Sequence, residues 1–310
     1  MNQPATEKIN AHTKLCAVFG FPVRHSASPD FQNEGFRALN LNWRYVACEV
    51  EPNTLRSAIE GAKALGFVGV NLTVPHKMLA MDMVDVLDES AKKWGAVNTI
   101  SFQSKNSHGI WESRGISNAT GKEVRVCGFN TDADAILRSI TEDLELDLSG
   151  KSVLVLGAGG AGRVAVLKLA EAKVSRLYLV NRTQSKIVEL EAEIKRDFPG
   201  VMVEKGYPAN KIDLVLNATS LGLKAEDTLP FDPDRFDLQK AGSAYDMIYN
   251  PGETPFLKMA RSHGLKAANG VGMLLYQGAK AFEIWTGRPA PLAEMRKALL
   301  ARIYGTDTLS

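Results

Sequence analysis

The sequence predicts an α/β protein of two domains: an N-terminal, mostly parallel α/β domain and a second domain of the Rossmann type, with a cleft between them. Three observations lead to this prediction. The chain has 310 residues, which exceeds the usual size of a single domain. Apolar runs typical of strands alternate with helical patterns, as parallel sheets require. Residues 153–156 form an uninterrupted apolar run that leads into glycines, which is typical of a buried strand followed by a tight turn.

Composition and charge indicate a globular protein that binds neither nucleic acid nor membranes. Hydrophobic residues make up 45% of the chain, charged residues 23%, and the net charge is +2. There is no basic stripe interleaved with aromatic residues and no apolar run of membrane-spanning length. The first 14 residues are polar and lack the apolar core of a signal peptide. Cys16, Cys48 and Cys127 read as free thiols, so we expect a cytoplasmic protein, and we expect no bound metal.

The first third of the chain reads as a β-α-β-α-β series. Residues 15–19 form the first strand, and the loop that follows ends in Ser28 and Pro29, which suit a helix N-cap and N1. Further strands are predicted at 43–50, 67–70 and 96–100, and further helices through 36–39, 52–65 and 78–85.

Residues 101–125 break this rhythm because they are polar and rich in turn-forming residues. We expect an extended surface hairpin or loop there. A strand at 126–129 follows, and residues 130–134 then cap a helix that runs to about residue 140.

The second domain is expected to span residues 131–271, and the first domain residues 1–130 together with 272–310. Two final helices, at 270–285 and 292–304, follow the last strand and are expected to pack on the first domain. The strands of the second domain are predicted at 153–156, 176–180, 214–216, 244–247 and 266–268, and its helices at 187–198 and 254–263.

Gly157, Gly159 and Gly162 have the spacing G-x-G-x-x-G between a strand and a helix. Gly157 suits the tight turn, Gly159 the close approach of a pyrophosphate, and Gly162 the packing of helix on strand. The first turn of the helix then offers free N–H groups and a positive dipole end to phosphates. A strand-to-helix turn without a ligand is the alternative, but the structural context favours a dinucleotide site.

The end of the second strand of this domain indicates which dinucleotide is bound. NAD-binding domains place an acidic residue there, on the ribose 2′-hydroxyl. Residues 181–186 contain no acid; Arg182 and Lys186 offer positive charge, and Asn181 and Thr183 offer hydrogen-bond donors. These residues favour NADP over NAD, although Thr183 also suits the N-cap of a solvated helix.

Polar residues also gather at strand ends of the first domain, in residues 24–28 and 71–77, and Asn98 and Asp132 lie at or just beyond strand ends. In open α/β sheets, ligands bind off the carboxyl ends of the strands. By pattern alone, however, Lys77 reads as a solvated lysine, and His25 and His76 as surface or structural histidines. The residues by themselves therefore lead to a two-domain NADP-dependent oxidoreductase of unspecified substrate.

A series of motifs in register gives a more specific indication. The segment 20–29, Gly-Phe-Pro-Val-Arg-His-Ser-Ala-Ser-Pro, resembles the opening G-x-P-x-x-H-S-x-S-P of shikimate dehydrogenases, in the shikimate/quinate dehydrogenase family. Similar motifs follow in the family's order at 71–77, 95–99, 130–132, 157–161, 181–183, 217–220, 245–249, 254–257 and 270–274, with Gln277 at the end.

The resemblance implies reversible, NADP-dependent reduction of 3-dehydroshikimate to shikimate, in chorismate and aromatic amino acid biosynthesis. Lys77 and Asp132 would be the catalytic pair. Asp132 favours the ammonium form of Lys77, whereas a lysine base must be neutral, so the sequence leaves open whether Lys77 is a base or a proton donor that Asp132 orients. The implied substrate ligands are Ser26, Ser28 and Tyr249 for the carboxylate, and Thr73, Lys77, Asn98, Asp132 and Gln277 for the ring hydroxyls.

The resemblance also implies a cofactor site, with some departures from the family pattern. Ala133 and Ala135 stand where the family usually has glycines, Lys186 replaces the commoner arginine, and residues 101–125 are longer than the family norm. The implied cofactor residues are Gly157, Ala158, Gly159, Gly160 and Ala161 for the pyrophosphate, Asn181, Arg182, Thr183 and Lys186 for the 2′-phosphate, and Met247, Gly270 and Glu89.

Three alternatives remain at this stage. The chain could be a quinate or dual quinate/shikimate dehydrogenase, using NAD or both cofactors. Folate-type methylene dehydrogenases share a related two-domain plan, but the serine pair and the Lys77–Asp132 pair argue against them. A non-catalytic NADP-binding regulator is the more remote alternative. A homodimer is left open.

Overall fold

The chain folds into two compact units, which are described separately. The computed structural model describes residues 9–116, 123–224 and 226–305. Unit 1 comprises Met1–Asp132 and Leu275–Ser310, and unit 2 comprises Ala133–Leu274. The boundaries fall within two helices, α5 (Asp132–Leu144) and α9 (Val271–Thr286).

Unit 1 contains a mixed sheet. The strand order is β2-β1-β3-β5-β7-β4, with β6 paired to β5. Strand β1 is parallel to β2 and β3, and β4 is parallel to β7, whereas β5 is antiparallel to each of its three partners. The strands are β1 (Lys14–Gly20), β2 (Trp43–Glu49), β3 (Gly69–Leu72), β4 (Val86–Leu87), β5 (Thr99–Lys105), β6 (Trp111–Ser113) and β7 (Val124–Phe129).

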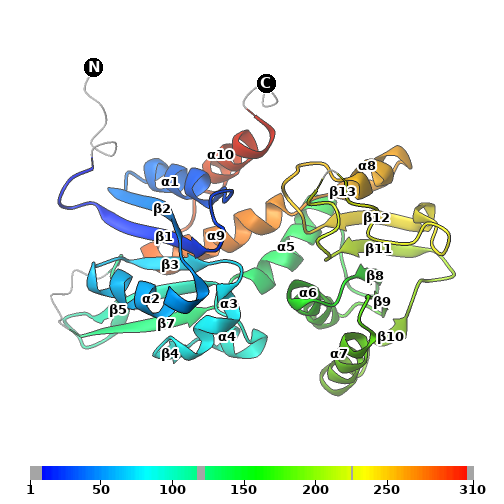
Figure 1. Ribbon diagram of the computed structural model, residues 1–310, viewed down its shortest axis with the longest axis horizontal. Helices are drawn as coiled ribbons and strands as arrows, with labels where there is room; N and C mark the ends of the chain where they lie inside the picture. Colours follow the sequence, from blue (N-terminus) through cyan, green and yellow to red (C-terminus); the bar gives the residue numbers. More distant parts are fainter. Residues whose placement is uncertain (1–8, 117–122, 225, 306–310) are drawn as a thin grey trace. The chain divides into compact units, whose positions relative to one another are not determined.

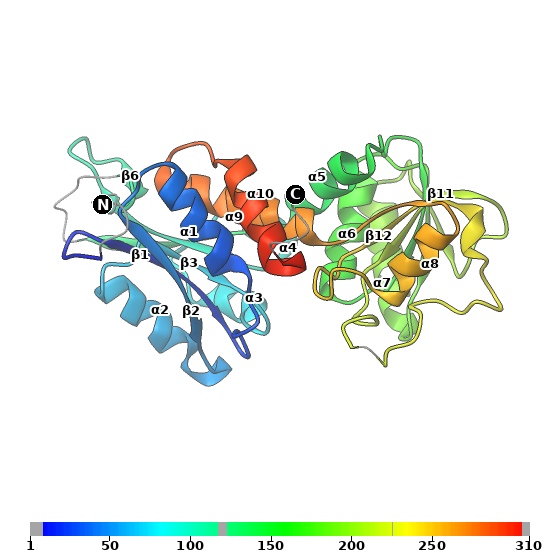
Figure 2. The same ribbon diagram turned by 90° about the horizontal axis from the view of Figure 1, so that it is seen from above.

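Helices cover both faces of this sheet (Figure 2), with α1 beside α10 on one face and α2 on the other. Leu55 and Ile59 of α2 are almost fully buried against the sheet, and Phe36 of α1 stacks on Phe282 of α9 at 5.2 Å. The helices of unit 1, besides its part of α9, are α1 (Ser28–Ala38), α2 (Leu55–Ala64), α3 (His76–Leu79), α4 (Glu89–Trp94) and α10 (Leu292–Tyr304).

Unit 2 has a fully parallel sheet with the strand order β10-β9-β8-β11-β12-β13 (Figure 1). This is the order of the Rossmann fold, in which the direction of winding reverses beside the first strand, here β8. The strands are β8 (Ser152–Leu156), β9 (Arg176–Val180), β10 (Met202–Lys205), β11 (Ile212–Asn217), β12 (Ala241–Asp246) and β13 (Lys266–Ala268). Its helices, besides most of α5, are α6 (Gly160–Glu171), α7 (Gln184–Asp197) and α8 (Pro255–Ser262).

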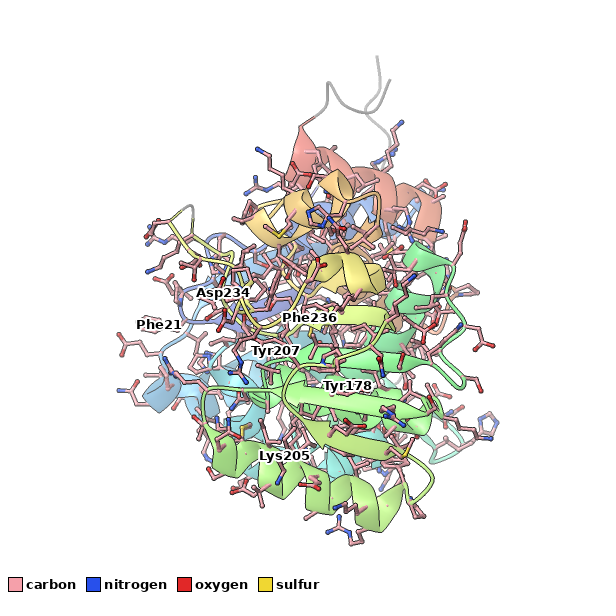
Figure 3. The ribbon with its side chains drawn as sticks, turned by 90° about the vertical axis from the view of Figure 1, so that its right-hand side faces the viewer. Phe21, Tyr178, Lys205, Tyr207, Asp234 and Phe236 are labelled. Atoms are coloured by element: carbon pink, nitrogen blue, oxygen red, sulfur yellow. The ribbon has the colours of Figure 1, made fainter. Side chains whose placement is uncertain are left out.

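One face of the unit 2 sheet is covered partly by an irregular segment, residues 226–240. A short loop, 206–211, joins β10 directly to β11, so the segment after β11 supplies the apolar cover. Phe231 and Phe236 of this segment are buried in the core, and Tyr207 stacks on Phe236 with ring centroids 5.8 Å apart (Figure 3).

The predicted fold class, an α/β protein of two domains with a Rossmann-type second domain, is confirmed. The sheet of unit 1, however, also contains the antiparallel pairs of β5, and several local predictions are wrong. Residues 101–105 are not surface loop: they belong to β5, which lies within the sheet, with Ser101 and Ser104 buried. Small hydroxyl residues fit a buried strand, so polarity alone misled the prediction. The helix expected over 78–85 ends at Leu79, and Ala27 rather than Ser28 is the N-cap of α1. A hairpin does occur within residues 101–125, since β5 and β6 pair antiparallel. Strands β4 and β10 and helix α4 were not expected, because each is short. Residues 117–122 of the expected hairpin lie outside the described residues.

Within the described part of the chain, every helix is too short or too polar to cross a membrane.

Candidate functional site

The polar loops of unit 1 meet at one edge of its sheet. Strands β1 and β3 are parallel and end at Gly20 and Leu72. Because β5 runs the opposite way, Asn98, directly before β5, lies at the same edge. Strand β7 returns to this edge and leads to Asp132. Backbone hydrogen bonds from Leu72 N to Asn98 O (2.8 Å) and from Asn98 N to Phe129 O (3.0 Å) hold these strand ends together.

Lys77 and Asp132 form an ion pair at this edge. Lys77 Nζ lies 2.7 Å from Asp132 Oδ2, and the two side chains are 33% and 15% exposed. Asp132 begins α5, and its N–H donates to Asn130 Oδ1 (3.1 Å). The pair is thus half-buried and still open to a small molecule.

The short helix α3 that carries Lys77 is held at its first two residues, His76 and Lys77. Val97 N donates to Lys77 O (2.8 Å), and the buried His76 ring places Nε2 2.8 Å from Val50 O. Burial lowers the pKa of His76, so the neutral ring donates this bond. His76 is therefore structural, and His25 is exposed.

Asn98 connects three elements of unit 1. Its Nδ2 donates to Thr131 Oγ1 (2.9 Å) and lies 3.5 Å from Gln277 Oε1 on α9, while its Oδ1 accepts from Thr131 N (2.8 Å). Asn98 is 1% exposed, so its orientation is set by these bonds. The structure thereby brings Gln277 to the predicted site, from the far end of the sequence.

A buried hydrogen-bond network of Tyr45, Asn71 and Thr99 lies beneath the site and was not predicted from the sequence. The Tyr45 hydroxyl donates to Asn71 Oδ1 (2.7 Å), and Asn71 Nδ2 donates to Thr99 Oγ1 (3.0 Å). Burial raises the pKa of Tyr45 well above its usual value, while a hydrogen bond with Ser28 acts in the opposite direction. Tyr45 therefore remains a neutral donor. The alternating pattern of strand 43–50 places Tyr45 on the inward face among apolar residues. This pattern could have predicted a buried tyrosine that needs a hydrogen-bond partner.

The two serines and Thr73 lie on the loops that follow β1 and β3. Ser28 is buried at the start of α1, and its N–H lies 3.3 Å from Ser26 Oγ. Thr73 N donates to Phe19 O (2.9 Å), and a Cβ on Gly20 would lie 2.4 Å from Thr73 Cγ2. A glycine at position 20 is therefore what allows Thr73 to approach the end of β1.

In unit 2, the glycine loop joins β8 to α6, beside the point where the strand order reverses. Gly157 has φ +101°, and a Cβ on Gly162 would lie 2.3 Å from Gly157 O, so neither position accepts a side chain. Around Gly159 and Gly160, in contrast, an added Cβ would meet nothing within 4 Å. The turn therefore leaves open space at the N-terminus of α6, where a pyrophosphate fits.

The segment after β9 lies next to this loop. Asn181 Oδ1 accepts from Ala158 N (2.9 Å) and its Nδ2 donates to Thr183 O (2.8 Å), which ties the two turns together. Thr183 is the N-cap of α7, without a side-chain cap bond. Arg182 and Lys186 are exposed and suit an anionic phosphate, which agrees with the absence of an acid in 181–186.

The remaining predicted residues fall into two groups. Met247 and Gly270 are adjacent in unit 2: a Cβ on Gly270 would lie 2.2 Å from Met247 O. Tyr249, half-buried, follows on the same segment. Glu89 lies instead in unit 1, at the first position of α4, where it pairs with Lys92 at 2.6 Å.

These features define a class of protein: an α/β chain with a nucleotide-binding Rossmann unit and a second unit whose sheet edge carries an ion-paired lysine. Family models give the particular family. Residues 18–100 match the shikimate dehydrogenase substrate binding domain, residues 138–222 match shikimate/quinate 5-dehydrogenase, and residues 270–300 match the shikimate 5′-dehydrogenase C-terminal domain.

Individual proteins agree with these models. The chain is 40% identical to the shikimate dehydrogenase (NADP(+)) of Desulforamulus reducens over 300 residues, covering 94% of this chain and 96% of the relative. It is therefore a member of the shikimate dehydrogenase family, as the motifs indicated.

Two solved structures show the same fold. One is shikimate 5-dehydrogenase of Thermus thermophilus in complex with NADP(H) and shikimate (32% identity, TM-score 0.75, 93% of this chain and 99% of that chain). The other is a ligand-free 5-ketofructose reductase of a Gluconobacter strain (31% identity, TM-score 0.76, 94% and 99%).

Proposed function

We propose that this protein catalyses the reversible, NADP-dependent reduction of 3-dehydroshikimate to shikimate, within aromatic amino acid biosynthesis. The observation that carries the proposal is the Lys77–Asp132 ion pair, half-buried at the sheet edge of a shikimate dehydrogenase family member. The Desulforamulus relative bears the name of this activity, and the Thermus structure was solved with both ligands.

The proposed substrate site follows from the polar groups at the sheet edge of unit 1. Hydroxyl donors bind a carboxylate without adding a titrating charge, which suits Ser26 and Ser28; Tyr249 of unit 2 would assist. The amide groups of Asn98 and Gln277 can both donate and accept, as alcohol groups of a ring require. The remaining ligands of the ring hydroxyls would be Thr73, Lys77 and Asp132.

The proposed cofactor site is supported by the fit of the glycine loop. Gly157 to Ala161 would hold the pyrophosphate, because an added Cβ at Gly159 would face open space and the N-terminus of α6 favours anions. Asn181, Arg182, Thr183 and Lys186 would hold the 2′-phosphate. Met247 and Gly270 would lie next to the nicotinamide. Glu89 is proposed as a cofactor residue from the family resemblance alone.

The chemistry requires a hydride on the carbonyl carbon and a proton on its oxygen. NADPH supplies the hydride when bound. Lys77 Nζ lies 2.7 Å from Asp132 Oδ2, so we propose that Lys77 gives the proton on reduction and that Asp132 orients it. In the reverse direction, the same nitrogen receives the proton of the alcohol.

A quinate/shikimate dehydrogenase is the second candidate, because the family model over residues 138–222 covers both activities. Lys186 stands where the family usually has arginine, and a lysine cannot bind the 2′-phosphate in a bidentate manner. The difference in affinity between NADP and NAD should therefore be smaller than with arginine. Initial rates with shikimate and quinate, each with NADP+ and NAD+, separate these candidates. We expect the highest kcat/KM for shikimate with NADP+; a higher value for quinate would overturn the proposed substrate, and no turnover would revive the non-catalytic regulator.

We further propose that unit 1 is the substrate-binding and catalytic domain and unit 2 the NADP-binding domain, with limits near residues 1–130 plus 272–310 and 131–271. A cytoplasmic location is supported by Cys16, Cys48 and Cys127, which are free thiols. The homodimer stays a prediction that analytical ultracentrifugation would test.

A further inference from the structure

Two loops of unit 2 meet at one buried carboxylate, that of Asp246. Asp246 is the last residue of β12 and is 0% exposed. Its Oδ2 accepts from Thr254 Oγ1 (2.6 Å), and its Oδ1 accepts from Asn217 Nδ2 (3.0 Å) and Ile248 N (3.0 Å). All three donors are neutral, so the carboxylate is held by hydrogen bonds alone.

The first loop follows β11 and adjoins the glycine turn. The Oδ1 of Asn217 accepts from both the N–H and the hydroxyl of Thr219, at 3.0 and 2.8 Å. A Cβ on Gly157 would lie 3.0 Å from Ala218 O. Through Asn217, Asp246 thus holds the backbone on which the glycine turn rests.

The second loop, residues 247–254, carries Met247 and Tyr249. Ile248 N and the Thr254 hydroxyl, near its two ends, bind the same carboxylate. Thr254 is also the N-cap of α8, where its Oγ1 accepts from Leu257 N at 3.3 Å. Asp246 therefore sets the position of this loop relative to the sheet and to α8.

Burying the carboxylate of Asp246 lowers the stability of the folded protein. We take this cost as an indication that the hydrogen bonds of Asp246 are needed to hold the two loops. Burial raises the pKa of Asp246 to about 6, and the neutral donors offset only part of that cost. An aspartate accepts three hydrogen bonds here and so joins two loops and a strand end. An asparagine could keep the same connections, because its amide can donate to the Thr254 hydroxyl, which then accepts.

We propose that Asp246 is a positioning residue for hydride transfer, acting through Met247 and Tyr249, which it holds in register with the glycine turn. This inference rests on the proposed function, since it takes Met247 and Tyr249 as residues of the cofactor and substrate sites. Asp246 does not itself touch either ligand in this proposal.

Steady-state kinetics with shikimate and NADP+ test the inference in Asp246→Ala and Asp246→Asn, together with calorimetric titration of NADP+. A misplacement of about 1 Å near reacting atoms costs roughly 100-fold in rate, so we expect a loss of about that size in kcat/KM for Asp246→Ala. Because Asp246 is linked to the glycine turn only indirectly, through Asn217, while the proposed pyrophosphate contacts lie on the β8–α6 turn itself, the Kd of NADP+ should change much less than kcat/KM. Asp246→Asn should restore kcat to within about threefold of the wild type.

Asp213→Ala is the matched control. Asp213 lies near the opposite end of β11 and accepts from Ser152 N (2.9 Å) and Ser152 Oγ (2.8 Å), so its loss destabilises the same sheet away from the site. We expect a lowered Tm with unchanged kcat. The inference is overturned if Asp246→Ala keeps wild-type kcat and KM, or if Asp213→Ala loses kcat/KM equally.

If Asp246→Ala does not fold, Thr254→Val and Thr254→Ser provide the same comparison, because only the serine keeps the donor to Asp246. Equal kcat/KM in these two folded variants would then overturn the inference. Failure of the proposed function is recognised separately, as absence of shikimate turnover in the wild type.

Discussion

At the scale of single residues, the Lys77–Asp132 pair allows a direct prediction about chemistry. Replacing Lys77 by alanine removes the proton donor but leaves the other proposed substrate ligands in place. General acid catalysis contributes about 10²- to 10⁴-fold, so kcat should fall by that range while KM for shikimate rises much less. Steady-state rates in both directions measure this split.

Lys105→Ala is a suitable control for this variant, because Lys105 pairs with Glu123 at the surface of the same unit, away from the proposed site residues, and its loss should leave kcat unchanged. An unchanged kcat in Lys77→Ala would remove Lys77 from the chemistry and would leave it a binding residue at most.

Asp246 allows a prediction about stability against pH. Its folded-state pKa of about 6 lies above the ordinary value of 3.8, so its contribution to stability is fully present below pH 3.8 and is lost as the pH rises through 6. The wild type should therefore lose about 2 kcal/mol relative to Asp246→Asn between pH 4 and 7. Urea unfolding of both proteins across this range measures the difference, and a constant difference would contradict the shift.

The individual residues were predictable where a motif or a strand end marked them. Lys77 and Asp132 follow predicted strands and Asn98 lies within one, and the structure places all three at one sheet edge. Tyr45 and Asp246 were not predicted as supporting residues, because each acts through buried hydrogen bonds to partners that local pattern does not identify.

At the scale of elements, the β8–α6 turn contains glycines with two different roles: Gly162 allows close packing of the backbone, and Gly159 leaves space for the proposed pyrophosphate. Gly162→Ala would place a Cβ 2.3 Å from Gly157 O, so it should lower both Tm and NADP+ affinity. At Gly159, in contrast, an added Cβ would face open space, and φ is −72°, which alanine readily adopts. The Gly159→Ala variant without ligand should therefore keep the Tm of the wild type. Its methyl group would, however, meet the proposed pyrophosphate, and NADP+ affinity should fall at least about tenfold.

Thermal unfolding and calorimetric titration of the two variants check this prediction. Unchanged NADP+ affinity in Gly159→Ala would show that no pyrophosphate approaches this turn. A wild-type Tm in Gly162→Ala would show that the turn can relax around the added methyl group.

Elements with strong apolar runs were predicted well, and short or polar ones were not. The run 153–156 is part of strand β8, with each of its four residues at most 1% exposed. Strand β5 carries serines and a glutamine, so its central place in the sheet depends on pairing with β3 and β7. That pairing is a tertiary property, and a local pattern does not contain it.

At the scale of the whole molecule, the chain divides into two units that carry different groups of predicted residues. Unit 1 holds the Lys77–Asp132 pair and the amides of Asn98 and Gln277, while unit 2 holds the glycine turn and the cationic segment after β9. The sequence indicated this division because the glycine motif comes late and two helices follow the last strand. These groups predict that unit 2 binds NADP+ and unit 1 binds shikimate.

Hydrogen exchange in the presence of each ligand alone tests which unit binds which ligand. A ligand at 100 times its Kd stabilises the state that binds it by about 2.7 kcal/mol, which slows exchange through opening of that state by roughly 100-fold. NADP+ alone should therefore slow exchange at the β8–α6 turn and the start of α7, and shikimate alone at the loops after β1 and β3 and at the start of α5. Protection by NADP+ confined to unit 1 would contradict the assignment of the glycine turn, and absence of shikimate protection near Lys77 would contradict the proposed substrate site.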